Sequence, residues 1–143
     1  MRVSDVLREK GADVISVAPT TRIADVVAVL AEYRIGAVAV LSGRQLVGVL
    51  SERDILREMA RSGHGILDDC AEKVMSLPIH VCGLNDPVDA LMSTMTAERV
   101  RHLPVLHEDV VVGMISIGDV VKRRVMQLQV EADQLAGYIA SGR

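Results

Sequence analysis

The sequence predicts an α/β fold made of two similar units, each with the element order β-α-β-β-α. A motif occurs twice, as GVLSERDIL from Gly48 and as GMISIGDVV from Gly113, 65 residues later. The apolar pattern of a preceding helix, at positions 23, 26, 27 and 30, recurs with the same offset at 88, 91, 92 and 95. An internal repeat of this kind is the sequence signature of a duplicated structural unit.

The first unit is predicted to begin with a strand in DVISVAP, at 13–19. Apolar residues at i, i+3, i+4 and i+7 from Ile23 indicate a helix with one buried face. Two strand-like runs, AVAVL at 37–41 and QLVGVL at 45–50, are joined by SGR, whose Gly43 suits a tight hairpin turn. A second helix is expected to begin at the Ser-x-x-Asp motif.

The second unit repeats this order, with strand-like runs at 78–82, 102–106 and 110–115. Asp86 followed by Pro87 is typical of a helix N-cap with proline in the first turn. Pro104 has no backbone N–H to donate, so we expect it at a sheet edge or at the start of a strand.

The repeat divides the chain into residues 1–62 (first repeat), 63–70 (linker), 71–125 (second repeat) and 126–143 (C-terminal helix extension). The register of the repeat drifts in its early part, where Val17 aligns best with Val81 and Leu7 with Met75. Each unit alone would expose an apolar sheet face, and packing the two units together buries both faces. The core must be aliphatic, because the chain has no Phe or Trp.

Ser-x-x-Asp at the start of a helix has two interpretations. Ser51 with Asp54, like Ser116 with Asp119, matches a capping box that satisfies free backbone groups of the first helical turn. The same geometry can bind a nucleotide, because a helix N-terminus attracts phosphate and a carboxylate can accept hydrogen bonds from ribose hydroxyls. The preceding glycine would let the backbone approach the ligand closely. For a single motif, local hydrogen bonding favours the capping interpretation. Two motifs at the same position of a repeat favour a shared binding function.

The ordered set of motifs resembles a tandem pair of CBS domains, the small repeat named after cystathionine β-synthase, together called a Bateman module. GVLSERD and GMISIGD are similar to the family's Gly-x-x-Thr/Ser-x-x-Asp, GAVAVL and RHLPVL to its central strand, and VISVAP to its first strand. The resemblance extends from about residue 3 to residue 125. It implies two repeats packed with pseudo-twofold symmetry, and the ending QLAGYI resembles that of stand-alone bacterial-type CBS proteins.

The resemblance also implies a regulatory module that binds an adenosine-containing ligand, such as AMP, ADP, ATP, NAD(H) or S-adenosylmethionine, in the cleft between the repeats. Asp54 and Asp119 would hold ribose hydroxyls, and Ser51 and Ser116 would contact phosphate. Strand residues would frame the adenine with backbone polar groups and aliphatic side chains: Ser16, Val17, Gly36, Ala37, His80, Val81, Arg101 and His102.

The two copies differ beside the motif, so we expect two non-identical sites. In the first copy Arg53 can donate charge-assisted hydrogen bonds to a phosphate, or can simply be a solvated helix charge. The second copy has Gly118 in that place, but it carries Arg101, His102 and, in the next helical turn, Lys122.

Composition narrows the functional classes. A net charge of −3 and only two Tyr as aromatic residues argue against a dedicated nucleic-acid binder. No apolar run approaches the roughly 18 residues of a membrane span, and the N-terminus lacks the apolar region of a signal peptide. We therefore expect a cytoplasmic protein, in which Cys70 and Cys82 are free thiols.

No catalytic or metal-binding set emerges from the sequence. His80, Cys82 and His102 could share a strand face, but a hydrogen-bonded histidine is favoured over a metal ligand at such spacing. GVLSERD does not match the G-x-S-x-G of a nucleophilic serine. We expect no enzyme activity and no required cofactor, so that a partner protein in trans would supply any regulated activity.

Apolar residues at 121, 125, 128, 132, 135 and 139 form a heptad-like seam that has no counterpart in the first copy. The seam predicts a helix that contacts a partner or a second copy in a homodimer; the alternative is that it folds back on its own domain. A structural or adaptor homodimer, whose Ser-x-x-Asp motifs only cap helices, is the alternative function.

Near the N-terminus, whether REKGAD, at 8–13, shapes a site or is only a loop stays open.

Overall fold

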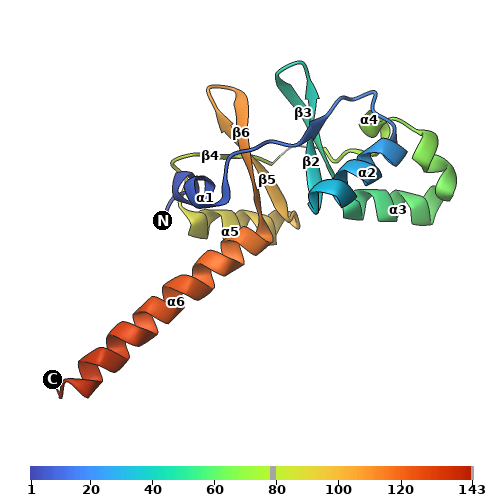
Figure 1. The fold of residues 1–143 in the computed structure, drawn as a ribbon. Coiled ribbons are helices and arrows are strands. Elements are labelled where there is room, and N and C mark those ends of the chain that lie inside the picture. Colours follow the sequence, from blue (N-terminus) through green and yellow to red (C-terminus); the bar gives the residue numbers. More distant parts are fainter. Residues whose placement is uncertain (78–79, 143) are drawn as a thin grey trace.

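The computed structural model describes residues 1–77 and 80–142, and both halves have the predicted order β-α-β-β-α (Figure 1). The first half contains β1 (Ser16–Val17), α2 (Ile23–Tyr33), β2 (Ala37–Ser42), β3 (Gln45–Ser51) and α3 (Glu52–Ser62). The second half contains β4 (Cys82–Gly83), α5 (Val88–Glu98), β5 (His102–His107), β6 (Val110–Ser116) and α6 (Ile117–Ala140). The remaining elements are α1 (Val3–Lys10), a 3-10 helix (His64–Asp68) and α4 (Ala71–Val74).

Each half has a three-stranded sheet of the same topology. The central strand, β2 or β5, lies parallel to the short first strand and antiparallel to the third. The hairpin turn of the first half contains Gly43 at φ 62°, as predicted from SGR. In the second half Glu108 and Asp109 adopt φ 50° and 63°, so this turn uses the left-handed region without a glycine.

The two cores exchange segments. Although α1 precedes the first repeat in the sequence, its Val3 and Leu7 are buried in the core of the second half. In the other direction, Ile66 and Ala71, from the 3-10 helix and the start of α4, are buried in the core of the first half. Figure 1 shows α1 beside the second sheet and α4 close to α2 and α3. The repeat units of the sequence and the packing units of the structure therefore differ at these two segments.

The motif glycines make room for this exchange. A Cβ atom on Gly113 would lie 2.7 Å from Cδ2 of Leu7, and one on Gly48 would lie 2.8 Å from Cγ of Met75. Carbon atoms in favourable contact are about 3.5–4.0 Å apart. These glycines thus admit α1 and the end of α4 against β6 and β3, which corrects the expectation that they let a ligand approach.

The expectation for Pro104 was wrong. Pro104 is fully buried within the central strand β5, where it pairs with Met114 of β6. Its counterpart in the first half, Ala39, donates a backbone hydrogen bond to Ile15 O at 3.3 Å, on the side of β1. Pro104 cannot do so, and β4 begins one residue later, opposite Val105. The central strand accommodates the proline because the neighbouring strand starts one residue later than in the first half.

The register of the first strands differs from the sequence alignment. Val17 pairs with Val40, and Cys82 pairs with Val105. The structural counterpart of Val17 is therefore Cys82, at the common offset of 65, and the alignment with Val81 was wrong. The strand predicted at 78–82 is observed at Cys82–Gly83, and residues 78–79 lie outside the described residues.

The start of α5 is also displaced from its predicted position. Pro87 is the N-cap residue, and the helix begins at Val88. Asp86 is not the cap: its Oδ2 accepts a hydrogen bond from the backbone N–H of Gly83 at 2.8 Å, in the turn before the helix.

The predicted C-terminal helix is confirmed. α6 has 24 residues, and Val120 and Arg123 near its start are buried. Farther along the apolar seam, Val125, Leu135 and Ile139 are 59%, 60% and 68% exposed. Figure 1 shows the helix projecting away from both halves. The alternative in which this helix folds back on its own domain is therefore wrong.

Candidate functional site

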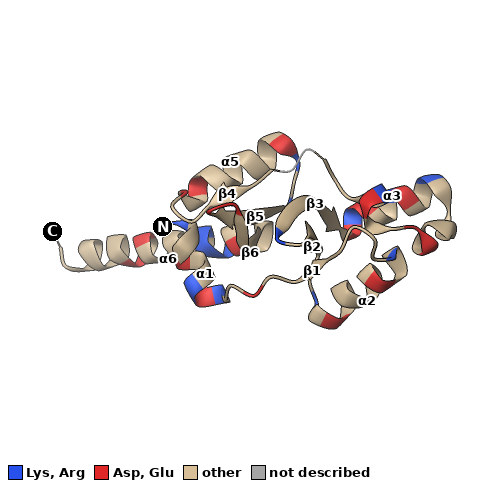
Figure 2. Cartoon of the chain, turned by 90° about the horizontal axis from the view of Figure 1, so that it is seen from above, with Lys and Arg blue, Asp and Glu red and all other residues tan. Residues whose placement is uncertain are grey.

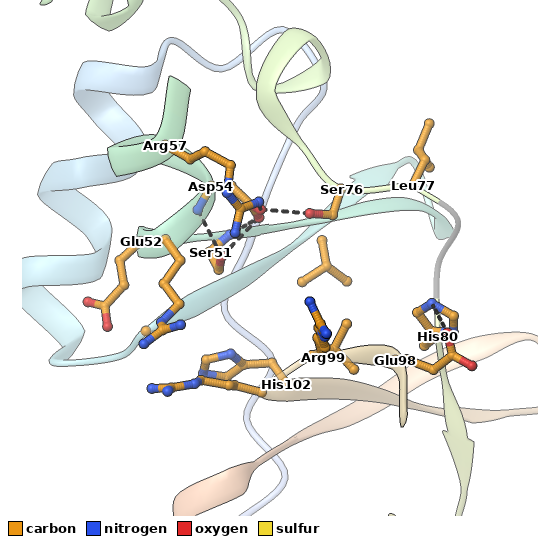
Figure 3. A pocket seen from close by; sticks show the side chains of 15 residues that line it. Ser51, Glu52, Asp54, Arg57, Ser76, Leu77, His80, Glu98, Arg99 and His102 are labelled. Atoms are coloured by element: carbon orange, nitrogen blue, oxygen red, sulfur yellow. Dashed lines mark hydrogen bonds and ion pairs between the residues drawn. The ribbon is translucent and has the colours of Figure 1, made fainter. Parts of the chain in front are cut away.

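A cavity of about 430 Å³ lies between the N-terminus of α3 and the segment that joins α5 to β5 (Figure 3). This volume is in the range of about 300–1,000 Å³ that is usual for small-molecule sites. The cavity draws its walls from both repeats, as a cleft between repeats requires. The predicted binding residues that line it are Gly36, Ser51, Arg53, Asp54, His80, Arg101 and His102.

The other predicted binding residues do not line this cavity: Ser16, Val17, Ala37, Val81, Ser116, Asp119 and Lys122. Val17 and Ala37 are buried in the sheet of the first half. Ser16 and Val81 are exposed. Ser116 and Asp119 belong to the second motif, which has different neighbours, and Lys122 follows it in the next helical turn.

Both Ser-x-x-Asp motifs form capping boxes, which confirms that interpretation of the pattern. Asp54 N donates to Ser51 Oγ at 3.2 Å, and Ser51 N donates to Asp54 Oδ2 at 2.9 Å. The corresponding distances for Ser116 and Asp119 are 3.2 Å and 2.8 Å. The box occupies one carboxylate oxygen of each aspartate and leaves the other for a further partner.

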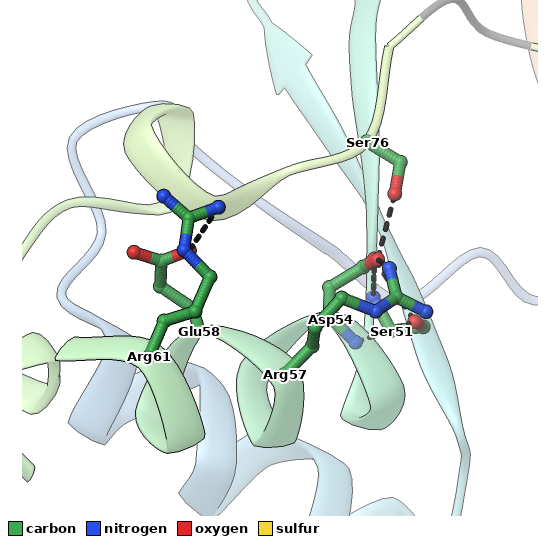
Figure 4. Close-up of polar contacts among 6 residues, drawn as sticks. All are labelled: Ser51, Asp54, Arg57, Glu58, Arg61 and Ser76. Atoms are coloured by element: carbon green, nitrogen blue, oxygen red, sulfur yellow. Dashed lines mark hydrogen bonds and ion pairs between the residues drawn. The ribbon is translucent and has the colours of Figure 1, made fainter. Parts of the chain in front are cut away.

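The second oxygen of Asp54 has a neutral partner (Figure 4). Ser76 Oγ donates a hydrogen bond to Asp54 Oδ1 at 2.7 Å. The guanidinium of Arg57 lies 3.7 Å from the same oxygen, and its side chain is 71% exposed. Asp54 is thus held in a fixed orientation by its own helix, while Oδ1 contacts groups that can be replaced by a ligand.

Charged groups of both signs surround the cavity. Arg53 and Arg57 come from α3, and Arg99 and Arg101 come from the segment between α5 and β5. Figure 2 shows acidic and basic residues next to each other on α3. Guanidinium groups can bind a phosphate through two parallel hydrogen bonds. The cavity therefore combines groups that bind an anion with the hydrogen-bond acceptor of Asp54.

The two halves meet where His102 lies against Gly36. A Cβ atom on Gly36 would be 3.1 Å from Nε2 of His102, so the imidazole fits because the glycine has no side chain. Burial lowers the pKa of His102, and the positive charges of Lys10 and Arg101 lower it further. The negative charges of Glu52 and Asp119 act to raise this pKa, but burial and the positive charges outweigh them. His102 is therefore neutral at neutral pH.

We expect His102→Gln to make the free energy of unfolding less sensitive to acid. Because the pKa of His102 in the folded chain is below its ordinary value of 6.5, the unfolded chain binds this proton first as the pH falls. The stability that the neutral His102 side chain contributes is complete above pH 6.5, and it is lost as the pH falls through the pKa that His102 has in the folded chain. Urea unfolding at neutral pH and at about pH 5 measures it.

The exposed His64 supplies the control for this measurement. His64→Gln should lose as much stability between the two pH values as the wild type loses, whereas His102→Gln should lose less. Equal losses in His102→Gln and the wild type would contradict the assignment.

The second motif has a charged hydrogen-bond partner, which contacts the carboxylate oxygen that the capping box also uses. Lys10 Nζ, at the end of α1, lies 2.6 Å from Asp119 Oδ2 and 2.7 Å from Met114 O. Burial acts to raise the pKa of Asp119, but hydrogen bonds from Lys10 and Ser116 outweigh it and lower this pKa. The segment REKGAD is therefore helical as far as Lys10 and places an ammonium group on the second motif.

Sequence reasoning missed Arg57, Ser76 and Arg99, which also line the cavity. Arg57 could have been found, because it stands 65 residues before the predicted Lys122. Ser76 follows Met75 in the segment that crosses to the first half, and that crossing has no local sequence signal. Arg99 ends α5 in the left-handed conformation, at φ 55°.

Cys70 and Cys82 are free cysteines, as predicted. Burial raises the pKa of Cys82 to about 12, so this residue is an unreactive thiol. Within residues 1–77 and 80–142, no cluster of three or more His, Cys, Asp or Glu side chains could hold a metal ion. In the same ranges, no helix combines the length and the apolar character needed to span a membrane.

The sequence matches the CBS domain family twice, over residues 3–61 and 71–125. The chain therefore belongs to the CBS-domain family and carries two copies of the domain. The fold class and the family resemblance inferred from the repeated motifs are both confirmed.

Solved structures extend this likeness to nearly the whole chain. A CBS-domain containing protein from Agrobacterium tumefaciens is 37% identical with a TM-score of 0.84, over 87% of this chain and 99% of that one. A CBS domain protein from Pyrobaculum aerophilum, solved in complex with AMP, is 30% identical with a TM-score of 0.77, over 92% of this chain and 99% of that one. The mitochondrial CBS domain-containing protein CBSX3 of Arabidopsis thaliana is 32% identical over an alignment of 149 positions, which covers 98% of this chain and 72% of that protein.

Proposed function

We propose that this protein is a regulatory module that binds an adenosine-containing nucleotide in the cavity between its two CBS repeats. The position of Asp54 carries the proposal: its carboxylate is fixed by a capping box at the N-terminus of an 11-residue helix and faces a cavity that four arginines line. The AMP complex of the Pyrobaculum aerophilum relative supports an adenine nucleotide as the ligand.

In this proposal the ribose lies at Asp54. A ribose hydroxyl replaces Ser76 Oγ as the donor to Asp54 Oδ1, since both are neutral hydroxyl groups. The phosphate lies between the N-terminus of α3 and the guanidinium groups of Arg53 and Arg57. The chain has no Phe or Trp to stack on the base. The aliphatic side chains of the cavity that would take this role are Val49, Leu77 and Val100.

A thermal-shift panel on the purified protein tests the proposal. The panel contains AMP, ADP, ATP, NAD, NADH and S-adenosylmethionine, with GMP as the control. A ligand present at about 100 times its Kd adds about 2.7 kcal/mol of stability, which is visible as a rise in Tm. We expect rises confined to adenosine-containing compounds. Flat traces from folded protein that is free of bound nucleotide would contradict the proposal.

We further propose that the bound nucleotide changes how the repeats or two copies pack, and that a separate protein responds to this change. A ligand shifts such an equilibrium only through its different affinity for the two states. In this proposal the module performs no reaction of its own, and it works in the cytoplasm as a homodimer.

A structural or adaptor homodimer is the second candidate, and the exposed seam of α6 favours it. Between Met126 and Ala140 the helix has two charged residues, Glu131 and Asp133, and Figure 2 shows its distal part almost free of charge. Light scattering after size exclusion distinguishes the oligomeric states. Leu135→Glu, on the seam, should convert a dimer to a monomer, whereas Gln127→Glu, off the seam, should not. For an adaptor alone, no nucleotide would change the Tm.

A further inference from the structure

Lys10 in the second half contacts the residues that correspond to the partners of Ser76 in the first half, although it reaches the capping-box oxygen of Asp119 whereas Ser76 reaches the other oxygen of Asp54. Ser76 N donates to Val49 O at 2.8 Å and Ser76 Oγ donates to Asp54 Oδ1 at 2.7 Å. The counterparts of Val49 and Asp54, 65 residues later, are Met114 and Asp119. Both accept from the single ammonium group of Lys10: Met114 O at 2.7 Å, and Asp119 Oδ2, which also accepts from Ser116 N, at 2.6 Å. One cation thus replaces two neutral donors.

This replacement changes what a ligand must displace. A serine hydroxyl can give up its place on Asp54 to a ribose hydroxyl, because both are neutral donors of the same kind. The contact of Lys10 with Asp119 joins opposite charges, and such hydrogen bonds are about twice as strong as neutral ones. The two side chains are 37% and 22% exposed, so water only partly screens the pair.

The backbone of Lys10 is also held in place. Lys10 is the last residue of α1, and Leu7, one turn earlier, is buried in the second core. The adjacent Glu9 forms an ion pair with Arg123 of α6, whose side chain is 8% exposed. Two ion pairs therefore fix the end of α1 to the first turns of α6, with the ammonium group on Asp119.

We propose that Lys10 closes the second nucleotide site. The protein then binds one nucleotide per chain, at Asp54, while Asp119 is held by a cation of the same chain. Removing the charge of Lys10 opens Asp119 as a second site. This inference rests on the proposed function of Asp54 as a nucleotide site.

Isothermal titration calorimetry with AMP tests the inference as a gain of binding. The wild type should bind one AMP per chain, and Asp54→Ala should bind none. The double variant Asp54→Ala/Lys10→Met should regain one site. The matched control is Asp54→Ala/Lys73→Met, because Lys73 is also an ion-paired lysine, 3.7 Å from Asp69, but lies on α4. Lys10→Gln, which keeps a neutral donor, should behave like Lys10→Met.

Three results would overturn the closure by Lys10 while leaving the Asp54 site standing. The first is two AMP molecules per wild-type chain. The second is a double variant that binds no AMP although the wild type does. The third is a loss of AMP binding in Lys10→Met alone, which would make Lys10 a contact of the ligand.

If AMP does not bind the wild type, the titration uses the compound of the thermal-shift panel that raises the Tm, and absence of binding by every compound of that panel would instead overturn the proposed function. An NMR titration of the Asp119 carboxyl group tests the contact between Lys10 and Asp119 in the absence of nucleotide. The pKa of Asp119 should be higher in Lys10→Met than in the wild type, because the cation that lowers it has been removed. An unchanged pKa would show that Lys10 does not hold Asp119.

Discussion

Asp54→Ala is expected to abolish the rise in Tm that AMP causes in the wild-type protein. The substitution removes the carboxylate that the proposed ribose contact requires. It also removes the acceptor of Ser51 N and of Ser76 Oγ. Ser51 remains as the N-cap, so breaking the capping box should cost at most the about 0.5–2 kcal/mol of a lost N-cap residue, and the variant should melt earlier even without nucleotide. The measurement must therefore separate the loss of binding from the loss of the cap.

Asp119→Ala provides the matched control, because it removes the same capping box from the second motif. Both variants should melt below the wild type without ligand. With AMP, the Tm of Asp119→Ala should rise as in the wild type, and that of Asp54→Ala should stay unchanged. If AMP raises the Tm of both variants equally, Asp54 only caps α3.

Leu7→Ala is expected to lower the free energy of unfolding by about 2–5 kcal/mol, the usual range for a buried leucine. Leu7 is 6% exposed and completes the core of the second half from α1. Leu56→Ala on α3 is the control: Leu56 is 65% exposed, and surface substitutions usually change stability by less than about 0.5 kcal/mol. Denaturant unfolding gives both values. Equal effects of the two substitutions would contradict the packing of α1 on the second half.

A double-mutant cycle with Gly113 tests the contact itself. Gly113→Ala alone should cost about 1–3 kcal/mol, because its new methyl group would overlap with Leu7. Combined with Leu7→Ala, that methyl group would enter space which the shorter side chain has vacated. The double variant should therefore lose less stability than the sum of the single variants. Strict additivity would show that the two residues are not in contact.

The sequence predicts those parts of the fold that have a local cause. Ser51 and Ser116 cap the helices that their motifs predict, and Gly43 adopts the positive φ expected in its turn. Pro104 was misplaced because a strand that starts one residue later leaves a central position open to proline. That condition depends on a neighbouring strand, and it cannot be read from the residues around Pro104.

In the candidate site, too, the residues with a local cause are predicted from the sequence and those placed by long-range packing are not. Ser51, Arg53 and Asp54 share one helix N-terminus, so a single motif predicts all three. Ser76 and Lys10 reach the two aspartates from segments that cross between the halves. Their sequence neighbours align, but alignment of a repeat does not show which half each segment joins. Long-range packing decides this, and with it the difference between the two motifs.

The exchange of segments also implies an order of folding during synthesis. The core of the first half is assembled from residues between Ile15 and Met75, so it can form as soon as these have been made. The core of the second half needs α1, and Lys10 is 109 residues away from Asp119 along the chain. Because domains tend to form as their residues emerge, α1 must wait with its apolar face uncovered. A chain stalled before β6 would carry a finished first core and an amphipathic helix open to chaperones or aggregation.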